Sequence, residues 1–352
     1  MDRVLHSPWA MSAGPWMSTG TWHGERRPLL LAPMAGVTDL PFRLLARECG
    51  ADLAITEFTN STALTREATT SWRRMETHPT EQPFIPQIFG GDIHDMVSAA
   101  RLLEDNADVI DLNFGCPAPK VTRVCAGAAL MGEPDHLLEI VRAVADAVEV
   151  PVTAKMRLGT GSGPDTVLDL VERLPDAGAR RVCIHGRTLK QRYAGTANWD
   201  VIAEAVERSS VPVIANGDVV DGPSAAACLK RTGAAGVMIG RGAIGRPQVF
   251  GDIAAHLGWV EEGSLPWVMH DPEAWHAADG IGRDFLARRW CWSRYLELAE
   301  QTTGLRTKWM QRHAVAFTKG LPGGKAVRAV MHEQPDEAAF AARVSDFLIA
   351  GA

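Results

Sequence analysis

The chain has 352 residues, of which 46% are hydrophobic and 22% are charged, so it can bury a large core without disulfide bonds. This composition excludes collagen-like, disordered and small disulfide-rich proteins. Lys and Arg total 36 against 42 Asp and Glu, a net charge of −6, so any surface that binds nucleic acid must be confined to one region.

Residues 1–27 contain Gly, Ser, Pro and Trp but no apolar core behind a basic start, which argues against a signal peptide or a membrane span. We expect an adaptable N-terminal extension. The six cysteines have no CxxC spacing, which is typical of reduced thiols in a cytoplasmic protein, and no structural metal site is predicted.

From residue 28 onward, short apolar runs alternate with amphipathic stretches. The predicted strands are Leu29–Pro33, Leu53–Glu57, Phe84–Phe89, Val109–Leu112, Val152–Met156, Val182–His185, Val213–Ala215 and Gly236–Ile239. The predicted helices are Leu40–Glu48, Ile93–Glu104, His136–Val148, Val167–Leu174, Val201–Val206, Pro223–Lys230 and Pro247–His256. This alternation over residues 28–258 predicts an α/β protein with a (β/α)8 TIM barrel, although periodicity alone also allows a doubly wound open sheet.

Polar or unusually small residues lie at or just beyond the carboxyl end of each predicted strand, and this favours the barrel. They are Met34, Ala35, Glu57, Gln87, Asn113, Cys116, Lys155, Arg157, His185, Arg187, Asn216, Gly217, Asp218, Gly240 and Arg241. In a barrel the carboxyl ends of all strands meet at one mouth, where such enzymes build their sites. In an open sheet the same residues would be spread along an edge.

Beyond residue 258 the alternation gives way to Trp-rich helical sequence, so we predict a smaller all-helical domain over residues 259–352. Six basic residues and no acidic one lie between Gln301 and Arg328. They are Arg306, Lys308, Arg312, Lys319, Lys325 and Arg328, with Trp309, His313 and Phe317 between them. A solvated helix face is the usual explanation of a charge run, but the lack of any acid favours a cationic surface for nucleic acid.

The turns after the seventh and eighth predicted strands carry Gly217, Gly240 and Gly242 beside Arg241. Backbone N–H groups in these two turns bind phosphate in many barrels. Glycines alone could simply close tight turns, but the bidentate guanidinium of Arg241 favours a phosphorylated cofactor.

Lys155, His185 and Gln87 end three different strands and would donate hydrogen bonds into the mouth. A lone strand-end lysine is more often solvated, and a lone histidine is more often structural. Together the three suggest donors for a heterocycle that gains negative charge on reduction, such as a flavin.

Cys116 lies in the segment Asn113-Phe114-Gly115-Cys116-Pro117, on a turn directly after an apolar strand. A thiol presented there could donate a proton or attack an electrophile. The other cysteines are interpreted as small buried side chains, or as a small loop residue in the case of Cys125.

The sequence resembles the tRNA-dihydrouridine synthase family over nearly the whole chain from Pro28. The matching segments are Ala32-Pro33-Met34-Ala35-Gly36-Val37-Thr38-Asp39, Asn113-Phe114-Gly115-Cys116-Pro117, Ala154-Lys155-Met156-Arg157-Leu158-Gly159, Ile184-His185-Gly186-Arg187-Thr188, Ala215-Asn216-Gly217-Asp218 and Ile239-Gly240-Arg241-Gly242. Each segment is weak alone, but six in order at barrel spacing are highly specific.

The resemblance implies an FMN barrel that reduces the C5=C6 bond of uridines in tRNA, with NADPH as the usual reductant. It implies flavin contacts from Pro33, Met34, Ala35, Gln87, Lys155 and His185, and phosphate contacts from Asn216, Gly217, Asp218, Gly240 and Arg241. Asn113, Arg157 and Arg187 would face the substrate, and Cys116 would be the general acid. The helical domain would hold tRNA through Arg306, Lys308, Arg312, His313, Lys319, Lys325 and Arg328.

Two alternatives stay open at this point. A dihydroorotate-type dehydrogenase is also an FMN barrel with a Cys-Pro turn, but its free pyrimidine substrate gives no reason for the basic C-terminal stretch. A non-catalytic module that binds tRNA would need that stretch but no flavin site.

Overall fold

The computed structural model describes residues 26–334 and 336–351. The expected N-terminal extension therefore lies outside the described residues except for Arg26 and Arg27. Arg26 forms an ion pair with Asp52 at 2.6 Å, and Arg27 donates a hydrogen bond to the carbonyl of Leu229 at 3.2 Å. Both arginines are thus held against the base of the sheet.

The described chain contains nine parallel strands in the order β2-β1-β9-β8-β7-β6-β5-β4-β3. They are β1 (Leu29–Leu31), β2 (Leu53–Ala54), β3 (Thr59–Asn60), β4 (Gln87–Phe89), β5 (Ile110–Phe114), β6 (Val152–Arg157), β7 (Ala179–His185), β8 (Val213–Asn216) and β9 (Gly236–Ile239). The two end strands, β2 and β3, belong to one segment, and a parallel bridge between Ile55 and Ile85 joins that segment to the chain before β4. The sheet is therefore closed, as a (β/α)8 barrel requires, and the open-sheet alternative is wrong.

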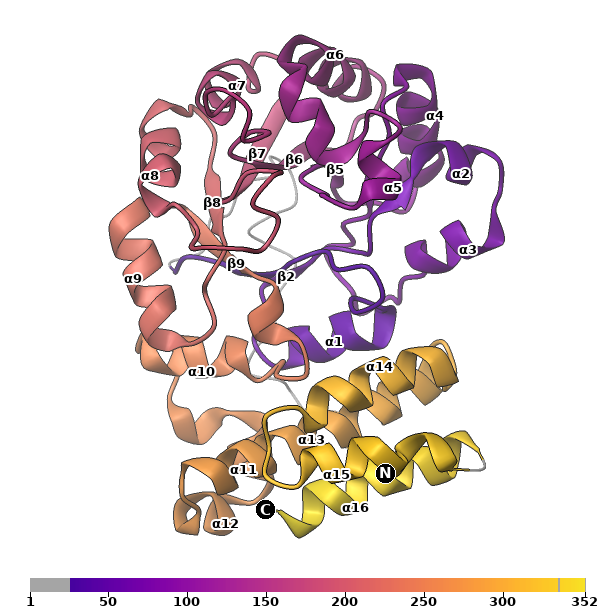
Figure 1. Ribbon diagram of the computed structural model, residues 1–352, viewed down its shortest axis with the longest axis vertical. Helices are drawn as coiled ribbons and strands as arrows, with labels where there is room; N and C mark the ends of the chain where they lie inside the picture. Colours follow the sequence, from indigo (N-terminus) through magenta and orange to yellow (C-terminus); the bar gives the residue numbers. More distant parts are fainter. Residues whose placement is uncertain (1–25, 335, 352) are drawn as a thin grey trace.

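In the described part of the chain, the longer helices between the strands surround the barrel (Figure 1). They are α1 (Leu40–Glu48), α4 (Ile93–Glu104), α6 (Pro134–Ala145), α7 (Val167–Arg173), α8 (Trp199–Arg208), α9 (Gly222–Thr232) and α10 (Val249–His256). Capping residues and prolines in the sequence determine where these helices begin and end. Helix α6 begins two residues earlier than predicted because Pro134 is favoured at the first helical position. Helix α9 begins at an Asp221–Ser224 capping box and ends at Gly233, whose φ of 64° suits glycine.

Short helices occupy the loops at the carboxyl ends of the early strands, namely α2 (Ser61–Thr65), α3 (Thr69–Trp72) and α5 (Pro119–Thr122). The C-terminal part is all helical, as predicted. It contains α11 (Pro266–His270), α12 (Pro272–Ala277), α13 (Gly280–Gln301), α14 (Thr307–Thr318), α15 (Gly324–Val330) and α16 (Glu337–Ala350). Figure 1 shows these helices gathered on the side of the barrel that carries α1 and α10. In the described residues, no helix is both long and apolar enough to cross a membrane.

A buried carboxylate joins the barrel to the helical part. Asp39 caps α1 by accepting from the N–H of Phe42 at 3.2 Å. It also accepts from the hydroxyl of Tyr295 on α13 at 3.0 Å and lies 3.1 Å from Nε2 of His313 on α14. Burial and the Asp39 charge hold the pKa of Tyr295 well above its usual value, so the phenol remains a donor. One side chain thus fixes two C-terminal helices against the barrel.

His313 is 2% exposed and stacks on Phe42 with ring centroids 4.9 Å apart. Its sequence position between exposed cations suggested a contact with RNA. The structure contradicts that prediction, because a buried ring engaged with Asp39 cannot reach a phosphate outside the fold.

We predict that Asp39→Ala lowers the free energy of unfolding by roughly 2–4 kcal/mol. The substitution removes a helix cap and leaves the buried side chains of Tyr295 and His313 without their partner. The matched control is Asp92→Ala, at the exposed N-cap of α4, where only the cap is lost and about 1 kcal/mol is expected. Urea unfolding of both variants measures the difference. Equal losses would show that the contacts to Tyr295 and His313 add no stability.

Candidate functional site

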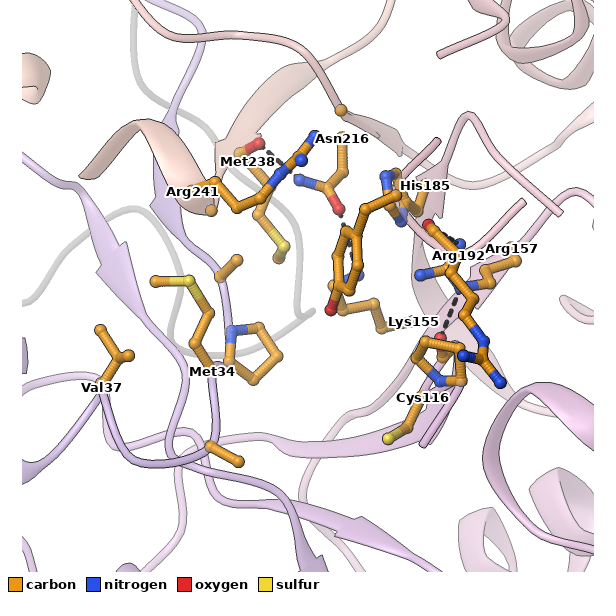
Figure 2. Close-up of a pocket in the computed structure, with 18 of the residues that line it drawn as sticks. Met34, Val37, Cys116, Lys155, Arg157, His185, Arg192, Asn216, Met238 and Arg241 are labelled. Carbon is orange, nitrogen blue, oxygen red and sulfur yellow. Dashed lines mark hydrogen bonds between the residues drawn. The ribbon is translucent and has the colours of Figure 1, made fainter. Parts of the chain in front are cut away.

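A cavity of about 980 Å³ opens at the carboxyl ends of the barrel strands. Thirteen of the predicted site residues line it, namely Pro33, Met34, Ala35, Asn113, Cys116, Lys155, Arg157, His185, Asn216, Gly217, Asp218, Gly240 and Arg241. Figure 2 shows Met34 and Val37 across the cavity from Cys116, Arg157 and His185. The strand ends therefore converge as the sequence predicted.

Lys155 and Asn216 connect β6 to β8 across the floor of the cavity. The Lys155 Nζ donates to Oδ1 of Asn216 at 3.2 Å, and Nδ2 of Asn216 donates to the carbonyl of Met238 at 2.8 Å. This second bond orients the amide so that its oxygen faces the ammonium. The contact leaves two of the three ammonium protons of Lys155 for a ligand.

The ring of His185 lies beside this pair at the end of β7. Burial, followed by the charges of Lys155 and Arg157, lowers the pKa of His185 to about 2. Burial also lowers the pKa of Lys155. At neutral pH the imidazole is therefore uncharged, so it offers one N–H donor and one nitrogen acceptor to a neighbouring group.

The turns after β8 and β9 form a cradle for an anion. In the described part of the chain, the backbone N–H groups of Gly217, Asp218 and Gly240 donate to no protein acceptor. Gly217 has a φ of +117°, and a Cβ there would lie 2.8 Å from the Ala197 Cβ and 3.0 Å from the His185 ring. Only glycine lets the turn pass so close, and the free N–H groups fit a phosphate.

Arg241 supplies positive charge at the same turns, with about half of its side chain exposed. The Asp218 carboxylate is already engaged, because it pairs with Arg187 at 2.8 Å and accepts from the N–H of Ala197 at 2.6 Å. Any contact of Asp218 with a phosphate would therefore come from its backbone N–H.

A chain of buried amides positions Cys116. The Asn113 Oδ1 accepts from the N–H groups of Gly115 at 3.0 Å and Cys116 at 2.9 Å. Its Nδ2 donates to Oε1 of Gln87 at 2.7 Å, and Nε2 of Gln87 donates to Asp111 at 2.6 Å. The sequence predicted Gln87 on the cavity wall, but the structure places it fully buried behind Asn113, where both ends of its amide serve the protein.

The Cys116 thiol lies at the edge of the cavity, with 7% of the residue exposed. Burial raises the pKa of Cys116, although the N–H of Ala118 and the charges of Arg157 and Lys155 act in the opposite direction. The group is therefore a protonated thiol at neutral pH. Such a thiol suits proton donation better than nucleophilic attack.

Two arginines that were predicted to face the substrate have different environments. Arg157 lines the cavity and holds the Cys116 turn, since its Nε donates to the carbonyl of Gly115 at 2.7 Å. Burial lowers its pKa to about 10, so it stays cationic. Arg187 lies behind the wall, where it pairs with Asp218 and donates to the carbonyls of Ala194 and Gly195. The structure thus supports a substrate contact only for Arg157.

The predicted RNA-binding residues do not form one uniform surface. Those exposed in the structure are Lys308, Arg312, Lys319 and Lys325. Arg306 instead pairs with Glu76 at 3.2 Å, and Arg328 donates to the carbonyl of Thr318 at 2.8 Å. Both arginines therefore already have partners within the protein, which leaves fewer of their N–H groups for RNA.

Arg312 connects the exposed cations to the cavity mouth. A Cβ on Gly36 would lie 1.7 Å from an Nη of Arg312, so the guanidinium rests directly on that glycine. The two residues on either side of Gly36, which are Ala35 and Val37, line the cavity. Helix α14 therefore places a cation beside the opening.

Sequence reasoning missed several lining residues, including Phe58, Arg192, Tyr193, Met238 and Arg246. Met238 lies within a strand that reads as uniformly apolar, so nothing distinguishes it. Arg192 and Tyr193 lie in the long loop after β7, and a basic residue followed by an aromatic one after a site histidine was a usable signal.

A closed parallel barrel with a polar cavity at the carboxyl ends of its strands is the architecture of a TIM-barrel enzyme. The family model described as dihydrouridine synthase (Dus) matches residues 30–348. The chain belongs to this family.

Named relatives agree with the family model. A "Probable tRNA-dihydrouridine synthase" of Rhizobium leguminosarum is 45% identical over 65% of this chain and 72% of its own length. The "Probable tRNA-dihydrouridine synthase" of Rickettsia prowazekii is 33% identical over 91% of this chain and 94% of its own length. The "tRNA-dihydrouridine synthase B" of Escherichia coli is 43% identical over 66% of this chain and 73% of its own length.

We predict that Gln87→Leu lowers the free energy of unfolding by about 2–4 kcal/mol, because buried groups of Asn113 and Asp111 lose their partner. It should also speed the labelling of Cys116 by a thiol reagent, since the turn loses its support. Gln301→Leu, at the exposed end of α13, should change stability by about 0.5 kcal/mol or less. Urea unfolding and labelling kinetics measure both effects, and an unchanged labelling rate would disprove the positioning role.

Proposed function

We propose that this protein reduces the C5=C6 bond of uridines in tRNA to give 5,6-dihydrouridine. Membership of the dihydrouridine synthase family supports this reaction over a free-pyrimidine dehydrogenase or a non-catalytic tRNA-binding module. The single observation that carries the proposal is the joint placement of a protonated thiol, a buried ammonium and an anion cradle around one cavity. The cytoplasm, where tRNA is modified, is the expected location.

The cavity fits FMN as cofactor. The free N–H groups of Gly217, Asp218 and Gly240, together with Arg241, would hold its phosphate. Lys155 and the neutral His185 would hydrogen-bond the polar edge of its ring, and the apolar segment Pro33-Met34-Ala35 would cover a ring face. When bound and reduced by NADPH, FMN would supply the hydride that the uracil takes up at C6.

The protein's own residues complete the reduction at C5. The Cys116 Sγ holds a proton for C5, and its elevated pKa keeps that proton in place at neutral pH. Asn113 fixes the turn that carries the thiol, and Arg157 ties the same turn to the next strand end. Delivery leaves a thiolate on Cys116, which regains its proton from solvent through the open mouth.

The uridine must leave its stack to enter a cavity of this kind. The exposed cations Lys308, Arg312, Lys319 and Lys325 would contact tRNA phosphates, which fixes position without reading base identity. Arg312, seated on Gly36, would contact the RNA nearest to the opening.

We predict that Cys116→Ala keeps FMN and tRNA affinity but lowers uridine reduction by about 10²–10⁴-fold, because the proton donor is lost. Single-turnover reduction of unmodified tRNA by the FMN-loaded protein measures the loss. The matched control is Cys125→Ala, an exposed thiol in the following loop, which should keep wild-type rates. Full activity of Cys116→Ala would show that another group donates the proton.

We also predict that Gly217→Ala binds FMN at least tenfold more weakly, because the added Cβ meets the Ala197 side chain and the His185 ring and disturbs the cradle. The control is Gly258→Ala, which has a similarly left-handed φ of +69° but no atom within 4 Å of its added Cβ. Both variants carry backbone strain, so only the first should lose FMN in a fluorescence titration. Equal losses would show that strain alone is responsible.

A further inference from the structure

Tyr193 is a cavity residue to which the proposed reaction assigns no role. It lies in the loop between β7 and α8, lines the cavity and is 54% exposed. The other tyrosine of the chain, Tyr295, is 2% exposed and has a structural partner in Asp39. Packing in the core therefore does not explain why an aromatic ring stands at position 193.

The loop holds Tyr193 in place from both sides. The Arg157 Nη1 donates to the carbonyl of Arg192 at 2.8 Å, and the Arg187 Nε donates to the carbonyl of Ala194 at 3.1 Å. Arg192 itself has a φ of +50°, a conformation that is unfavourable for a non-glycine residue. Two buried arginines thus support a strained backbone that presents the ring at the opening, which is typical of a functional position.

Positive charges flank the ring. The Cζ of Arg241 lies 5.1 Å from the ring centroid and that of Arg157 lies 5.7 Å away, both within cation–π range. Despite these neighbours, more than half of the residue stays exposed. An exposed aromatic ring in basic surroundings is the arrangement that binds unstacked nucleic acid, since the ring face receives a base and the positive charge favours a polyanion nearby.

We propose that Tyr193 forms a stacking subsite for a nucleobase of tRNA at the cavity mouth and thereby positions the target uridine. The inference rests on the proposed function, because it adds a base-binding subsite to the same cavity. The high exposure of Tyr193 favours RNA, rather than the cofactor, as the group that stacks on its ring. Lys155 and His185, the donors for the cofactor ring, are each 9% exposed, whereas Tyr193, whose ring centroid lies 6.4 Å from that of His185, is 54% exposed.

The experiment compares FMN-loaded Tyr193→Leu, Tyr193→Phe and the wild-type protein. Tyr193→Leu should bind unmodified tRNA about tenfold to a hundredfold more weakly, the range expected for the loss of one base–aromatic stack. Its FMN content and melting temperature should not change. Tyr193→Phe keeps the ring and should retain wild-type affinity within about threefold.

The salt dependence of tRNA binding separates stacking from charge. Tyr193→Leu should weaken binding by the same factor at every salt concentration. Lys308→Ala, which removes an exposed cation, should instead reduce the slope of log Kd against log salt concentration by about one. A change of slope in Tyr193→Leu would mean that the ring acts through its arginine neighbours, and would overturn the proposal.

Wild-type tRNA affinity in Tyr193→Leu would also overturn the stacking subsite, whether or not that variant loses FMN. Because binding is measured without turnover, the test is independent of the reaction. If wild-type protein reduced no uridine and Tyr193→Leu still weakened tRNA binding, the proposed reaction would fail while the subsite stood.

Discussion

The register of the parallel strands is the constraint on which the cavity depends. Arg157 on β6 pairs with His185 on β7, His185 with Asn216 on β8, and Asn216 with Met238 on β9. Closure through Ile55 and Ile85 brings the remaining strand ends around to the same mouth. Arg157 and Met238, which are 81 positions apart in the sequence, therefore meet at one level, and a slip of one residue would turn these side chains to the opposite face of the sheet.

Burial and charge compete inside the cavity, and burial decides the protonation of the key groups. Its described lining carries Lys155, Arg157, Arg192, Arg241 and Arg246 but a single carboxylate, that of Asp218. This field alone would favour a Cys116 thiolate, yet desolvation is the larger effect and keeps the thiol protonated. At His185 both effects act in the same direction, which is why its pKa falls so far. The cavity therefore combines an affinity for anions with a retained proton donor.

The sequence predicted those features that depend on local chemistry. The Cys116 turn and the glycines of the anion cradle follow from residues that are close together in the chain, and the structure places them as expected. Each of the eight predicted strands overlaps a strand of the barrel, but the two-residue strand β3 was not predicted. Gln87 and Arg187 were assigned to the cavity because they end strands or follow strand ends. Their actual roles depend on Asn113 and Asp218, which come from other barrel units and which no spacing rule connects to them. His313 was misassigned for the same reason, since its partner Asp39 is 274 positions away.

The attachment of helix α14 would link the proposed RNA binding to the chemistry of the cavity. Asp39 fixes His313 to the N-terminus of α1, and one residue earlier on α14 the Arg312 guanidinium rests on Gly36. Both contacts fall on the turn between β1 and α1, which also contributes Met34 and Val37 to the cavity wall. A helix docked elsewhere could still attract tRNA, but its phosphate contacts would have no fixed distance to Cys116. Because one turn carries both the cavity wall and the helix anchor, a phosphate bound by Arg312 would be held at a position that the fold fixes relative to the thiol.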